Sequence, residues 1–71
     1  MTDTHLLRYF ISKNGDTIEG LASYLGIGRV ALSSKINNRS EFKQSEIHLI
    51  AKRYKLTVEN CARLFFGVVP V

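Results

Sequence analysis

The chain of 71 residues is long enough for one small domain, and its hydrophobic fraction of 45% excludes a disordered tail. Ten lysines and arginines against six acidic residues give a net charge of +4, which suits an anionic partner such as nucleic acid and equally suits an ordinary basic surface. A single cysteine excludes a disulfide-stapled scaffold, and two isolated histidines do not make a metal-ligand cluster, so we expect no bound metal or other cofactor.

The two ends of the sequence show no targeting signal. The first residues lack the basic and then apolar pattern of a signal peptide, and the longest apolar run is too short to span a bilayer. We therefore expect a single domain over residues 1–71, located in the cytoplasm and without a membrane partner.

The first predicted helix covers residues 3–13. Four apolar residues share one face of such a helix: Leu6, Leu7, Phe10 and Ile11. Asn14 and Gly15 end the helix, because both residue types tolerate a left-handed backbone.

Two shorter helices are predicted at residues 17–25 and 29–37. Either Asp16 or Thr17 can cap the first of them. Its inner positions are all apolar: Ile18, Leu21, Ala22 and Leu25. The inner positions of the second are Leu32 and Ile36, one turn apart.

Two further helices are predicted at residues 44–54 and 58–66, the second capped by Thr57. Phe42, in the polar loop before them, is expected to pack against the core. The inner residues of both helices are expected to be Ile47, Ile50, Ala51, Leu64 and Phe65. The tail at residues 67–71 is apolar and β-prone, and it has three alternatives: a short strand, an arm that pairs with a second copy, or a frayed end.

Four residues between positions 22 and 32 have a spacing with a mechanical explanation. Ala22 is small enough for two crossing helices to touch, and Gly26 accepts the positive φ of a tight turn. Ile27 fills the space between the helices, and Leu32 anchors the second helix. This spacing predicts a helix-turn-helix over about residues 17–37.

Beyond this motif, the chain resembles the Cro/repressor-type helix-turn-helix regulators of Gram-positive phages. The resemblance covers roughly residues 5–67 and includes the segments 32–42, 44–47, 56–57 and 65–66. It implies an all-α, lambda-repressor/Cro-like domain of five helices that binds operator DNA in a bacterial host cell, often as a homodimer.

Two positions depart from the pattern of these regulators. Ile18 stands where many of them carry a glutamine that touches a phosphate, so we expect this contact to be absent. Gly28 stands where many have Ser or Thr, and glycine is a poorer helix cap by roughly a few tenths of a kcal/mol.

The recognition helix, at about residues 29–37, presents a short set of candidate readers. In a helix-turn-helix the first residues of the second helix face the base edges. Arg29 can contact guanine with two hydrogen bonds, Val30 can pack on a thymine methyl, and Ser33 and Ser34 are short and unselective. The remaining candidates are polar residues expected to meet phosphates: Lys35, Asn37, Asn38, Arg39 and Lys43. The alternative for each is a solvated side chain without a partner.

We therefore predict a sequence-specific, DNA-binding transcriptional regulator of a phage or prophage genetic switch. The alternative is an antirepressor or modulator of repression, in which the apolar start of the recognition helix docks a partner repressor and masks its DNA-binding surface. An enzyme is not expected, because neither a nucleophile–base pair nor a phosphate-binding glycine loop is visible. A core this small also leaves little room for a small-molecule substrate.

Overall fold

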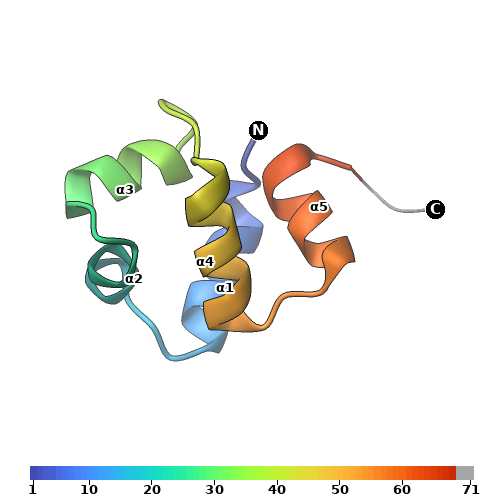
Figure 1. Cartoon of the computed structure of the whole chain (residues 1–71), viewed down its shortest axis with the longest axis horizontal. Coiled ribbons are helices and arrows are strands. Elements are labelled where there is room, and N and C mark those ends of the chain that lie inside the picture. The colour runs from blue at the N-terminus through green and yellow to red at the C-terminus, as the bar shows by residue number, and fades with distance from the viewer. Residues whose placement is uncertain (69–71) are drawn as a thin grey trace.

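The computed structural model describes residues 1–68, which form five α-helices and no β-strand (Figure 1). In chain order the helices are α1 (Thr4–Lys13), α2 (Ile18–Leu25), α3 (Arg29–Ile36), α4 (Gln44–Tyr54) and α5 (Val58–Phe66). This confirms the predicted all-α domain of five helices. Within residues 1–68 no helix has the length and apolar character needed to cross a membrane.

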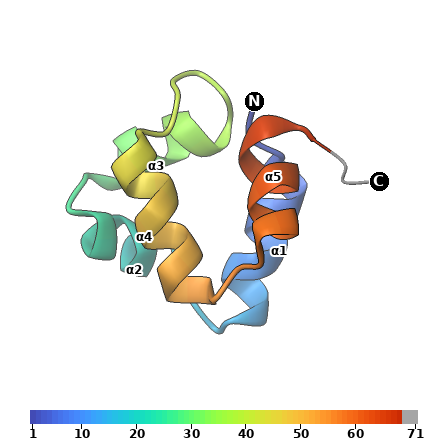
Figure 2. The same ribbon diagram turned by 45° about the vertical axis from the view of Figure 1, so that its right-hand side comes forward.

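The helices pack as two groups that α4 joins. α2 and α3 lie together at one end of the molecule, and α1 and α5 lie together at the other (Figure 1, Figure 2). α4 lies between them and contacts both α2 and α5. The side chains of α4 therefore determine how the α2–α3 pair sits on the rest of the domain.

Every helix contributes at least one fully buried side chain to the core. These are Leu7, Leu21, Leu32, Ile36, Ile50 and Leu64. Phe42 is partly buried and meets Phe65 edge-on, with ring centroids 5.5 Å apart, so it packs against the core as expected. Each buried aliphatic side chain stabilises the fold by roughly 1.5–3 kcal/mol. Because α3 is anchored through its inner residues, its opposite face is left to solvent.

The helix ends follow local signals. The hydroxyl of Thr17 accepts the N–H of Gly20 at 3.0 Å, and that of Thr57 accepts the N–H of Asn60 at 3.1 Å. Gly67 ends α5 with φ of 63°, as predicted. The predicted strand or arm lies mainly at residues 69–71, outside the described residues, and the homodimer stays a prediction.

Candidate nucleic-acid interface

The α2–α3 pair has the local geometry that its residue spacing predicts. Gly26 adopts φ of 73°, and the N–H of Ile27 donates to the carbonyl of Ala22 at 3.0 Å, which closes the turn. Ala22 is buried and Ile27 packs partly buried against the core. Figure 1 shows α2 end-on and α3 from the side, so the two helices cross steeply. α2 and α3 are therefore two helices joined by a tight turn, the arrangement that the predicted helix-turn-helix requires.

One face of α3 lies opposite its buried residues and is exposed at both ends, at Val30 and at Asn37. Its residues have the i, i+3, i+4, i+7 spacing of a single helical face and continue one position past the helix: Val30, Ser33, Ser34 and Asn37. We call these four residues the α3 face. Val30 is 84% exposed, and the two serines are partly buried. All four side chains are uncharged, so this surface offers contacts of shape and hydrogen bonding without charge.

The start of α3 lacks a side-chain cap. Gly28 is the N-cap residue at φ of −75° and has no side chain to accept the first N–H groups of the helix. A hydroxyl side chain at this position would meet open space, because a Cβ built on Gly28 has nothing within 4 Å. The poor cap expected from the sequence is therefore present, and the unpaired N–H groups give this end of α3 a partial positive charge.

Arg29 is exposed beside the α3 face but is not free. Its Nη1 lies 2.7 Å from Oε1 of Glu19 in the first turn of α2. The side chains are 68% and 61% exposed, so the pair is a surface ion pair of small energetic value. The sequence predicted Arg29 as a base reader but did not indicate a carboxylate beside it.

Lys35 is held inside the fold. Its Nζ lies 2.6 Å from Oε1 of Glu46, and the two side chains are only 12% and 6% exposed. The same oxygen of Glu46 accepts the backbone N–H of Lys43 at 2.8 Å. Burial raises the pKa of Glu46, but the hydrogen bonds from Lys35 and Lys43 outweigh it and leave that pKa below its ordinary value. Lys35 is therefore not available for the predicted phosphate contact, because its ammonium group neutralises a buried carboxylate.

Asn38 is also engaged within the fold. Its side-chain Oδ1 accepts the backbone N–H of Thr2 at 2.8 Å, and its Nδ2 donates to the carbonyl of Thr2 at 2.9 Å. The residue has φ of 63°, a conformation that asparagine tolerates better than most side chains. Nearby, the hydroxyl of Thr4 donates to the carbonyl of Ile36 at 2.7 Å. Asn38 thus ties the N-terminal segment to the end of α3, and its predicted phosphate contact is incompatible with this pairing.

Arg39 and Lys43 keep their predicted positions at the surface. Both are exposed, and no ion pair joins either of them to a carboxylate within residues 1–68. They flank the loop that follows α3. The candidate interface therefore consists of the α3 face, Arg29 at its start and these two loop cations at its end.

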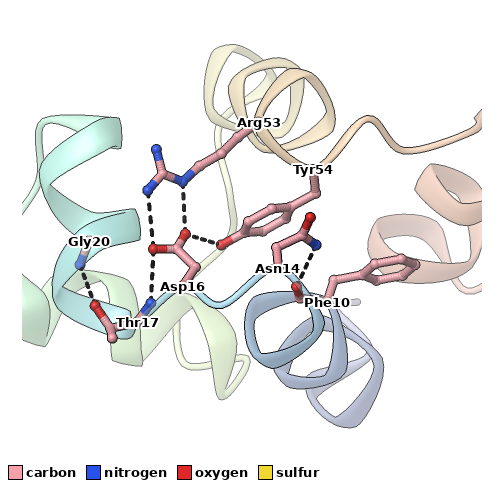
Figure 3. Close-up of polar contacts among 7 residues, drawn as sticks. All are labelled: Phe10, Asn14, Asp16, Thr17, Gly20, Arg53 and Tyr54. Atoms are coloured by element: carbon pink, nitrogen blue, oxygen red, sulfur yellow. Dashed lines mark hydrogen bonds and ion pairs between the residues drawn. The ribbon is translucent and has the colours of Figure 1, made fainter.

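A partly buried ionic cluster joins the start of α2 to α4 (Figure 3). Asp16 accepts hydrogen bonds from Arg53 at 2.7 and 3.1 Å, from the hydroxyl of Tyr54 at 2.6 Å and from the N–H of Thr17 at 2.8 Å. The guanidinium of Arg53 also lies over the ring of Tyr24, 4.6 Å from its centroid. The cluster joins the start of α2 to the end of α4.

The hydrogen bonds to the Asp16 carboxylate shift the pKa values of Asp16 and of Tyr54. The bidentate contact with Arg53 holds the pKa of Asp16 far below its ordinary value, despite partial burial. Burial, together with the bond to the carboxylate, raises the pKa of Tyr54 above its ordinary value. At neutral pH the cluster therefore consists of an ionised aspartate, an arginine and a neutral tyrosine.

The ion pairs of three carboxylates at this site, Asp16, Glu19 and Glu46, were not predicted from the sequence. Glu46 stands three residues after the N-cap Lys43, a spacing that marks a side chain reaching back to the cap. Asp16 was expected only as a possible cap, and Glu19 was not assigned a role. Their partners lie on other helices, and local spacing carries no signal for such pairs.

The chain was compared with models of known protein families, with curated proteins and with solved structures. No family model, no curated protein and no solved structure matches it.

Proposed function

We propose that this protein is a sequence-specific, DNA-binding transcriptional regulator that inserts α3 into the major groove. The observation that carries the proposal is the α3 face on the second helix of the predicted helix-turn-helix, with its opposite side anchored by Leu32 and Ile36. A major groove about 12 Å wide admits one α-helix. An anchored helix with one free face is the arrangement that such docking requires.

Each part of the interface has a chemical role in this proposal. Arg29 supplies the donors for guanine and Val30 an apolar contact for a thymine methyl, and Asn37, just past the end of α3, supplies a phosphate contact. Arg39 and Lys43 contribute phosphate contacts, which add affinity and salt dependence without sequence information. Because the sequence resembles phage regulators, we further propose that this activity serves a genetic switch of a phage or prophage in a bacterial host.

The test is selection of binding sites from a pool of random duplex DNA, followed by fluorescence anisotropy on the selected site. We expect Arg29→Ala to lower affinity for that site by roughly five- to 150-fold, the value of one bidentate base contact. Arg63→Ala is the matched control, because Arg63 is an exposed arginine on α5, away from the α3 face. No selected sequence, or equal effects of the two substitutions, would refute the proposal.

A second candidate function is binding to a partner repressor, which the protein would hold off DNA. The observation that favours it is the lack of net charge around the start of α3, where Glu19 neutralises Arg29 beside the exposed Val30. Protein interfaces favour such surfaces, because charged residues are depleted at their centres.

A mixing experiment with the repressor encoded beside this gene tests the second function. Val30→Glu is expected to abolish a complex in size-exclusion chromatography. Val58→Glu is the control, because Val58 is 86% exposed on α5 and Val30 is 84% exposed on α3. Absence of a complex with the unaltered protein rules out this second function for that repressor.

A further inference from the structure

The pairing of Glu19 with Arg29 places a carboxylate on the surface that is proposed to face DNA. A carboxylate close to DNA phosphates lowers affinity, since both groups are negative. Glu19 is the second residue of α2, and Arg29 is the first residue of α3. Their 2.7 Å contact therefore spans the two helices of the motif. The carboxylate also lies in the first turn of α2, where a negative charge stabilises the helix N-terminus, but its 2.7 Å contact is with Arg29 on the next helix.

We infer that Glu19 is a positioning residue that sets the base specificity of Arg29, an inference that rests on the proposed DNA-binding function. An arginine side chain has several rotatable bonds, and ordering it opposes binding. Glu19 contacts Nη1. A guanidinium has five N–H donors, so the Nε–Nη2 edge stays free to bind the O6 and N7 atoms of guanine. The carboxylate thus favours one orientation of the Arg29 side chain, by the small amount that a surface ion pair contributes, and leaves a bidentate edge exposed.

The contact also rejects the wrong base. The contact with Glu19 competes with a contact between Arg29 and a neighbouring phosphate, which would bind any sequence equally. Loss of the carboxylate frees the guanidinium for such contacts and removes a repulsive charge. Glu19→Gln is therefore expected to bind non-selected DNA more tightly and to discriminate less well at the base pair that Arg29 reads. These opposite changes are the signature of a positioning residue.

The charges around this pair do not offer Arg29 a second carboxylate partner. Of the other acidic side chains near this motif, Asp16, in the loop before α2, is bound to Arg53, and Glu46, on α4, is bound to Lys35. Among the described residues, Glu19 is the carboxylate paired with Arg29. A single substitution of Glu19 therefore releases Arg29 without disturbing the Asp16–Arg53 or the Lys35–Glu46 pair.

The experiment is a double-mutant cycle on the selected DNA site, with each base pair changed in turn. We expect Arg29→Ala to remove discrimination at one guanine, and Glu19→Gln to reduce discrimination at that same guanine by about three- to tenfold, a fraction of the bidentate contact. In the Arg29→Ala background, Glu19→Gln should leave discrimination unchanged. Glu59→Gln is the control for loss of an exposed carboxylate in the first turn of a helix, on α5.

The outcomes separate this inference from the function on which it rests. Failure of the unaltered protein to select any sequence overturns both. Selective binding in which Glu19→Gln keeps full discrimination, or changes it equally with and without Arg29, overturns the positioning role alone. A thermal melt of each variant accompanies the assay, and exposed carboxylates of this kind are expected to leave the melting temperature nearly unchanged.

Discussion

Replacing Asp16 by asparagine tests whether the ionic cluster between α2 and α4 stabilises the fold. The Asp16 side chain is only 9% exposed and accepts three side-chain hydrogen bonds from Arg53 and Tyr54. Hydrogen bonds to a charged group contribute about 1.5–3 kcal/mol each, but bonds that share one carboxylate do not add. Asparagine keeps one acceptor and loses the charge, so we expect a cost of about 2 kcal/mol. Asp16→Ala also leaves the Tyr54 hydroxyl unpaired, and we expect about 3 kcal/mol.

Urea denaturation followed by circular dichroism measures both losses, and a domain of this size should remain folded. A stability of roughly 4–10 kcal/mol is typical for about 70 residues, and each kcal/mol shifts the melting temperature by about 4–8 °C. Asp16→Asn is therefore expected to melt roughly 8–16 °C below the unaltered protein. Tyr54→Phe, which removes one donor only, should cost about 1 kcal/mol.

The pH dependence provides an independent check of the same cluster. The pKa of Asp16 is lower in the folded protein than its ordinary value of 3.8, so its stabilising contribution is fully present above that value. The contribution is lost as the pH falls through 3.8 towards the folded pKa. Stability of the unaltered protein should therefore fall on acidification below about pH 5, and Asp16→Asn should show a shallower fall. Parallel pH curves, or a cost below about 0.5 kcal/mol, would refute the reasoning.

Three other predictions concern residues that position α3. Lys35→Met should lower the free energy of unfolding by about 2 kcal/mol, because it leaves the buried Glu46 carboxylate without its cation. Adding Glu46→Gln should recover part of this loss. If the losses from the two substitutions are additive in urea denaturation, the pair is not coupled. Gly26→Ala should cost about 1–2 kcal/mol, because φ is 73°, whereas Gly28→Ser should stabilise by roughly a few tenths of a kcal/mol through a new cap. Equal thermal shifts would contradict this difference. Asn38→Ala should lower the free energy of unfolding by about 2 kcal/mol. Asn38→Gly should lower it less, because glycine retains the left-handed conformation of this residue. A lower melting temperature for Asn38→Gly than for Asn38→Ala would exclude a conformational contribution.

The helices were predictable because their ends depend on nearby residues. Thr17 and Thr57 cap helices through N–H groups three positions ahead, and Gly26 and Gly67 end helices through their own positive φ. The inner faces were equally predictable, since a 3.6-residue repeat identifies them within one helix. These features need no knowledge of how one helix lies on another.

The ion pairs were not predictable, because they depend on how the helices pack. Asp16 and Arg53 are 37 positions apart in the sequence, and Lys35 and Glu46 are 11 apart. Any of ten cations and six carboxylates could have been combined from composition alone. Lys35 therefore looked like a surface residue of the recognition helix, whereas its position on α3 turns it towards α4.

These ion pairs reduce the number of cationic side chains that can contact DNA. Three of the ten cations are committed to ion pairs, and two of the others, Arg39 and Lys43, lie beside the α3 face in the following loop. Each neutralised phosphate contributes about −0.9 to the slope of log affinity against log salt, so one copy using these two cations would show a slope near −2. A slope near −4 would mean either that two copies occupy one site or that other cations of the same copy contact phosphates. Substituting Arg39 and Lys43 by Ala distinguishes these, because in a two-copy complex that uses only these cations the slope should fall to near zero.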